Sequence, residues 1–157
     1  MTATPSQRLA ELGLVLPAVA APVAAYVPAV RSGAYVHTSG QLPFVDGALP
    51  ATGKVGEGPG LVAPEDANGL ARVAALNAIA AAAAVAGGVD HIARVVKVVG
   101  FVASDPAFTG QPGVVNGAST LLHEVFGEAG VHARSAVGVA VLPLDSPVEV
   151  EIIVEVA

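Results

Sequence analysis

The stretch HARSAVGVAVLPLDSPVEVEIIVEV, residues 132–156, decides the fold of this chain. Its residues alternate with a period of two over 133–142 and 148–156, which is typical of β-strands that bury one face. In the second run every other residue is valine or isoleucine, while Glu149 and Glu151 share the opposite face. We therefore predict two strands, each with one aliphatic face.

The first of these runs places a single cation among very small side chains. Its valine-rich face is predicted to pack under helices, and its other face carries Arg134 with Ala136 and Gly138 beside it. Such small neighbours leave open space around the guanidinium, which a ligand or a second subunit could fill. The alternative is a solvated sheet face with surface ion pairs, which contribute little to stability. We expect the two strands to form a hairpin through residues 143–147.

Outward from these strands, the chain alternates between strand and helix patterns. Leu70, Val73 and Leu76 recur at helical spacing, and Gly87 ends that helix. The predicted elements are a short helix at 5–14, strands at 26–30 and 34–41, a helix from residue 64, a strand at 91–102, a helix at 112–126 and the two strands above. This order predicts an α+β single domain, residues 1–157, whose sheet is covered by two helices on one face.

The composition limits the partners of this domain. Hydrophobic residues make up 54% of the chain and charged residues 13%, so apolar surface is expected to remain outside the core, which favours an oligomer. The seven lysines and arginines are scattered and the net charge is −6, which argues against nucleic acid. The apolar stretch 73–86 is shorter than the ~20 residues that span a bilayer, and prolines interrupt 14–30, so we expect no membrane. The absence of cysteine suits the cytoplasm.

The same C-terminal stretch resembles a known family. Its Ala-Arg-Ser core at 133–135, its Leu-Pro turn at 142–143 and its Val-Glu-Val-Glu strand at 148–151 are similar to the C-terminal signature of the YjgF/RidA family. Further matching motifs lie upstream in the same order: Tyr26-Val27, TSGQLP (38–43), Leu76-Asn77, Val95-Val96-Lys97, Phe101-Val102 and Val115-Asn116. The resemblance covers roughly residues 22–157.

This resemblance implies a fold, an assembly and an activity. Members have a chorismate-mutase-like α+β fold with a mixed, mostly antiparallel sheet, and form homotrimers with clefts between neighbouring subunits. They hydrolyse enamine or imine acids of the 2-aminoacrylate type to 2-keto acids and ammonia, with no cofactor or metal. Carried over by position, Arg134 binds the substrate carboxylate and Glu149 positions water; the other substrate-binding residues are Tyr26, Ser39, Gly40, Asn116 and Ala136.

The residue types agree with these implied roles. A guanidinium binds a carboxylate through two hydrogen bonds and stays charged, and a carboxyl group can place water and move a proton. In the expected hairpin, residue 149 lies opposite about residue 140, roughly 20 Å from Arg134 at ~3.4 Å per residue. We therefore expect Glu149 to reach the site from a neighbouring subunit. The alternative is that Glu149 and Glu151 only line a wet barrel interior.

Departures from the family pattern leave the substrate and the function open. Ala136 stands where archetypal members often have cysteine, and an N-terminal extension (1–21) and a long loop (43–60) could reshape the cleft. The alternative function is a non-catalytic trimer that binds small carboxylate metabolites in a regulatory role. Ribonuclease activity, which is attached to the family's name, is disfavoured by the acidic charge. His132 is expected either to touch the ligand or to serve in a turn or interface.

Overall fold

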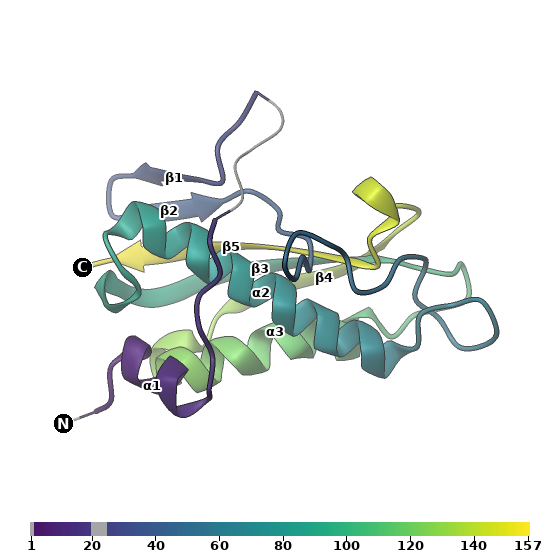
Figure 1. The fold of residues 1–157 in the computed structure, drawn as a ribbon, viewed down its shortest axis with the longest axis horizontal. Helices are drawn as coiled ribbons and strands as arrows, with labels where there is room; N and C mark the ends of the chain where they lie inside the picture. Colours follow the sequence, from purple (N-terminus) through teal and green to yellow (C-terminus); the bar gives the residue numbers. More distant parts are fainter. Residues whose placement is uncertain (1, 20–24) are drawn as a thin grey trace.

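The computed structural model describes residues 2–19 and 25–157, and within them five strands form one mixed sheet (Figure 1). The strands are β1 (Ala29–Ser32), β2 (Tyr35–Thr38), β3 (Ile92–Ala103), β4 (Ala133–Val139) and β5 (Val148–Val156). They lie in the order β1-β2-β5-β3-β4, with β3 and β4 parallel and the other neighbours antiparallel. The predicted mixed, mostly antiparallel sheet is confirmed.

Two long helices cover one face of this sheet, as the sequence predicts. α2 (Pro64–Ala86) and α3 (Gln111–Phe126) pack against each other and against the sheet (Figure 1). Proline in the first turn begins α2, and Gly87 ends it with a φ of +88°. Most of its alanines are buried, because their small side chains let the helix lie close to the strands. By length and composition α2 could cross a membrane, but 61% of its most apolar window is buried inside the fold, as in a core helix.

The predicted hairpin between the last two strands is wrong. β4 pairs in parallel with one side of β3, and β5 pairs with the other side, so β3 separates the two. The parallel pairing is possible because α3 forms the crossover from β3 to β4. The chain then crosses the end of β3 through the 3-10 turn Pro143–Asp145, where Leu144 and Asp145 have φ values of 58° and 57°. The amide of Ala103, the last residue of β3, donates to the carbonyl of Pro147 at 2.9 Å and closes this crossing.

The predicted orientation of β4 is also wrong. Arg134 and its small neighbours face α3, while Val137, on the opposite face, is 43% exposed. The cause is visible at Gly100, which pairs with Ala136 and over which Val115 of α3 lies so closely that a Cβ would fall 2.5 Å from a Val115 methyl group. The small residues admit the helix, and the valines face away from it. In β5 the predicted alternation is confirmed: its valines and Ile152 are buried and its glutamates are half-exposed.

The N-terminal extension and the long loop are both tied to the domain. Within the extension, α1 (Pro5–Glu11) buries Leu9, and Ser6 donates to Asp90 from its amide at 2.8 Å and from its hydroxyl at 2.6 Å. The end of the predicted extension, residues 20–21, lies outside the described residues. In the loop, the amide of Val55 donates to the carbonyl of Ala103 at 2.7 Å, which holds the loop to the end of β3.

Candidate active site

Arg134 leaves β4 toward α3 and is held there by three acceptors. Its Nη1 donates to Asn116 Oδ1 at 2.8 Å and to Ser119 Oγ at 3.2 Å, and its Nη2 donates to the carbonyl of Pro112 at 3.3 Å. All three acceptors belong to α3, so the helix sets the position of the guanidinium. The structure therefore brings together two of the predicted site residues, Arg134 and Asn116, and their contact with substrate stays a prediction.

Glycine positions bring α3 close enough to make these bonds. At Gly117 a Cβ would fall on the backbone carbonyl oxygen of Asn68, so α3 meets α2 here backbone to backbone. On the sheet side, Gly100 gives Val115 the space to lie on β3. With both contacts made, the neighbouring Asn116 projects toward β4. Ala136, two residues after Arg134 on the same strand, packs against the hydrophobic core with only a methyl group as its side chain.

A second group of predicted residues surrounds Glu149. The amide of Gln41 donates to the carbonyl of Val150 at 2.8 Å, and the amide of Val150 donates to the carbonyl of Gln41 at 3.0 Å, so the segment that contains Gly40 runs antiparallel alongside β5. A Cβ on Gly40 would fall on Glu149 Oε1 and lie 2.7 Å from its Cδ. Gly40 therefore makes room for the carboxyl group. Burial raises the pKa of Glu149, and the nearby Glu151 raises it further.

Ser39 and Tyr26 belong to the same side of the molecule as Gly40. The hydroxyl of Ser39 donates to the carbonyl of Val27 at 2.7 Å, and its amide donates to the carbonyl of Pro28 at 2.8 Å. These bonds fix the segment that follows Tyr26, whose side chain is 54% exposed. The Ser39 hydroxyl thus holds the backbone next to Tyr26, and substrate contact by either residue remains a prediction.

The two groups do not meet within one chain. Arg134 pairs with Val98 and Glu149 with Phe101, on opposite sides of β3. The two residues are thus displaced by about 10 Å across the sheet and about 10 Å along it. They also point to opposite faces, because Arg134 bonds to α3 whereas Glu149 shares the face that no helix covers. The earlier estimate rested on a hairpin that does not form, yet the two groups are separated all the same.

Sequence reasoning missed Ser119 as a partner of the arginine, and it offered His132 only as a residue that touches the ligand or serves in a turn or interface; the structure places the His132 ring on Ser119 and on the carbonyl of Gly130. Ser119 Oγ lies 2.9 Å from His132 Nε2 and accepts a bond from Arg134. Its signal was the spacing Asn116-x-x-Ser119, which puts both side chains on one face of a helix. Among the described residues no three His, Asp or Glu side chains gather to hold a metal ion.

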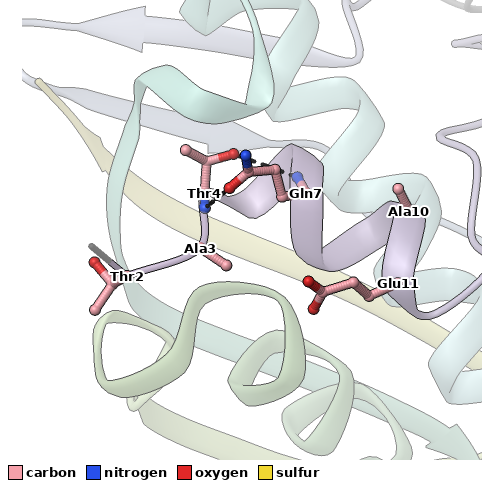
Figure 2. A pocket seen from close by; sticks show the side chains of 6 residues that line it. All are labelled: Thr2, Ala3, Thr4, Gln7, Ala10 and Glu11. Atoms are coloured by element: carbon pink, nitrogen blue, oxygen red, sulfur yellow. Dashed lines mark hydrogen bonds between the residues drawn. The ribbon is translucent and has the colours of Figure 1, made fainter.

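An open pocket beside α1 lies apart from both groups. Figure 2 shows its lining side chains, in which Thr4 and Gln7 form the capping box that begins α1. Glu11 is the only ionisable side chain among the six that line it. The pocket is therefore lined by residues that form and flank α1, and its lining holds no set of catalytic groups.

The family model described as "YjgF/chorismate mutase-like, putative endoribonuclease" matches residues 6–156. The chain belongs to this family. The match includes most of the N-terminal extension, in agreement with the packing of α1 onto the domain. The α+β sheet and its two covering helices are thus the YjgF-like fold.

Relatives across nearly the whole chain carry few functional names. Protein TCP17 of Trypanosoma cruzi is 46% identical over 148 residues, which cover 94% of this chain and 91% of that protein. The crystal structure of Atu1372 from Agrobacterium tumefaciens, a protein of unknown function, has a TM-score of 0.86 at 43% identity and covers 98% of this chain and 92% of its own. A putative endoribonuclease from Shewanella oneidensis has a TM-score of 0.92 at 34% identity and covers 98% and 100%.

A more distant YjgF-family structure carries a ligand. Escherichia coli TdcF was solved with bound serine, and it has a TM-score of 0.64 at 25% identity over 88% of this chain and 94% of its own. The family thus includes a protein that binds a small amino acid.

Proposed function

We propose that this protein hydrolyses enamine or imine acids to 2-keto acids and ammonia. The observation that carries the proposal is the guanidinium of Arg134, which α3 holds through Nη1 and Nη2. A guanidinium has five N–H donors, and these bonds use three of them. The Nε–H and the second Nη2–H have no partner among the described residues, and together they match the two oxygens of a carboxylate.

Glu149 supplies the second group that the reaction needs. Burial and the nearby Glu151 raise its pKa above the ordinary value, which favours a carboxyl that can both accept and return a proton. Water adds to the C=N carbon of the imine acid as a proton passes to nitrogen. The resulting carbinolamine then releases ammonia and leaves the C=O of the keto acid. The substrate carbon is already electrophilic, so positioning and proton transfer account for catalysis.

Completion of the site requires a second copy of the chain. Arg134 and Glu149 point to opposite faces of one sheet, so we infer that the substrate binds between Arg134 of one subunit and Glu149 of its neighbour. The sheet face without helices supports association, because Val137 and Tyr35 on it are 43% and 44% exposed. A ring of three copies would give three equivalent clefts, and we propose that the protein forms this homotrimer. We also propose that it works in the cytoplasm.

A non-catalytic role in binding small carboxylates is the second candidate. It is favoured by the serine bound to TdcF, since an amino acid shares its carboxylate with the proposed substrate. Ribonuclease activity has weaker support despite the names of several relatives. The seven basic residues of this chain are scattered and its net charge is −6, which does not suit a phosphate backbone.

Ammonia release tests the proposal directly. An amino-acid oxidase generates the imine in solution, and the purified protein is expected to accelerate its hydrolysis over buffer. Arg134→Ala should lose the acceleration, whereas Arg94→Ala, which removes an exposed arginine of β3, should keep it. No acceleration by the unaltered protein, or full activity in Arg134→Ala, would refute the proposal. Binding of keto acids without any turnover would favour the second candidate.

A further inference from the structure

Each hydrogen bond that His132 and Ser119 make has one possible donor and one possible acceptor. His132 Nδ1 lies 2.6 Å from the carbonyl oxygen of Gly130, which can only accept, so Nδ1 carries the proton. Burial and the nearby charge of Arg134 lower the pKa of His132, which favours a neutral ring whose Nε2 is an acceptor. The hydroxyl of Ser119 then donates to Nε2, and its oxygen accepts from Arg134 Nη1.

The chain of bonds is built on a fixed backbone. Gly130 lies so close to the end of α3 that a Cβ would fall on the carbonyl oxygen of Leu122. That contact places the Gly130 carbonyl beside His132, in the short 3-10 turn Gly127–Gly130 that leads into β4. The positions of the imidazole, the hydroxyl and the guanidinium are therefore determined before any ligand binds.

From this geometry we infer that Ser119 and His132 are positioning residues for Arg134. The inference rests on the proposed carboxylate-binding role of Arg134. Ser119 and His132 border a cavity of about 310 Å³ with Arg134, yet Ser119 Oγ is already bonded to His132 Nε2, and His132 Nδ1 to the carbonyl of Gly130. They act by holding the Nη1 side of the guanidinium, so that its Nε–Nη2 edge stays turned toward the carboxylate. A long side chain fixed in this way loses less freedom on binding, which raises affinity.

The variants separate this role from general packing. Ser119→Ala removes one of the three acceptors for Arg134 and the donor to His132. His132→Ala removes the acceptor for Ser119, whereas His132→Gln can present an amide oxygen near the place of Nε2. Thr120→Ala is the matched control, because Thr120 is the exposed neighbour of Ser119 on the same helix.

Two measurements follow. In ¹⁵N-arginine NMR spectra of the free protein, rotation of the Arg134 guanidinium should be slow and should accelerate in Ser119→Ala and His132→Ala; Arg134→Lys assigns the signal. In calorimetry with pyruvate, Ser119→Ala should bind up to roughly tenfold more weakly, as expected when a long side chain must be ordered on binding. His132→Gln should bind more tightly than His132→Ala, and Thr120→Ala should match the unaltered protein.

Unchanged guanidinium rotation in both Ser119→Ala and His132→Ala overturns the inference, as does unchanged pyruvate affinity in both. If the unaltered protein does not bind pyruvate, the proposed function fails at that point. The NMR measurement on the free protein still decides whether Ser119 and His132 hold the arginine, so the two failures remain distinct.

Discussion

The substitution Gly40→Ala, which adds a single methyl group, should lower the catalytic rate while leaving the stability of the fold nearly unchanged. Gly40→Ala would place Cβ 2.7 Å from Glu149 Cδ, and carbon atoms in contact need about 3.5–4.0 Å. The carboxyl group must therefore move by about 1 Å, which costs a positioned catalytic group up to ~10²-fold in rate. The moving atoms are the end of a flexible side chain, so the free energy of unfolding should change little.

Steady-state ammonia release measures the catalytic rate, and thermal unfolding of the same samples measures the stability. We expect kcat to fall by about 100-fold and KM to change little, because Arg134 is untouched. Gly69→Ala is the matched control: nothing lies within 4 Å of its added Cβ, and alanine stabilises an exposed helix position by about 1 kcal/mol. A correctly folded Gly40→Ala protein with the activity of the unaltered one would refute the role of Glu149.

Stability and pH dependence test other parts of the geometry. Gly117→Ala puts a Cβ onto the carbonyl oxygen of Asn68 and should lower the free energy of unfolding by about 1–3 kcal/mol in a urea titration; an unchanged midpoint would contradict the close α2–α3 contact. Because burial raises the pKa of Glu149, its stabilising contribution is present below its ordinary pKa of 4.5 and is lost as pH rises through the raised value. Glu149→Gln should therefore raise Tm at pH 7 and flatten its dependence on pH above 4.5, and a lower Tm would count against this. Bonds from Ser6 lower the pKa of Asp90, so their stabilisation is present above its ordinary 3.8 and is lost below it; Asp90→Ala should speed amide exchange at Ser6 at pH 7, and equal exchange would show that the bonds do not form in solution.

Local patterns predicted the helices well and the sheet topology only in part. Proline at residue 64 and glycine at residue 87 act within one or two turns of chain, so the bounds of α2 are readable from sequence. The order of strands depends on contacts between distant residues. Residues 143–147 suggested a hairpin turn, but the left-handed Leu144 and Asp145 lead the chain across β3 instead. The first strand was also misplaced, at 26–30 instead of Ala29–Ser32.

The sequence predicted which residues belong to the site, but it did not predict how their side chains are oriented. The structure brings Arg134 to Asn116 and Gly40 to Glu149, and the substrate-binding roles of these residues stay predictions. The orientation of Arg134 was wrong because valines were assumed to face the helices. In β4 the small residues do so, since α3 needs the space above Gly100 and Ala136. The contact between α3 and β3 decides which face of β4 is turned toward the helices, and the periodicity of β4 alone does not reveal that contact.

Subunit mixing tests most directly whether two copies share each active site. Arg134→Ala and Glu149→Gln are unfolded together in equal amounts and refolded, and ammonia release is then measured. If each cleft takes Arg134 from one subunit and Glu149 from the next, about a quarter of the clefts in randomly mixed rings are intact, so about a quarter of the activity should return. If both residues serve the same cleft from one chain, or if the protein stays monomeric, the mixture will remain as inactive as either variant alone.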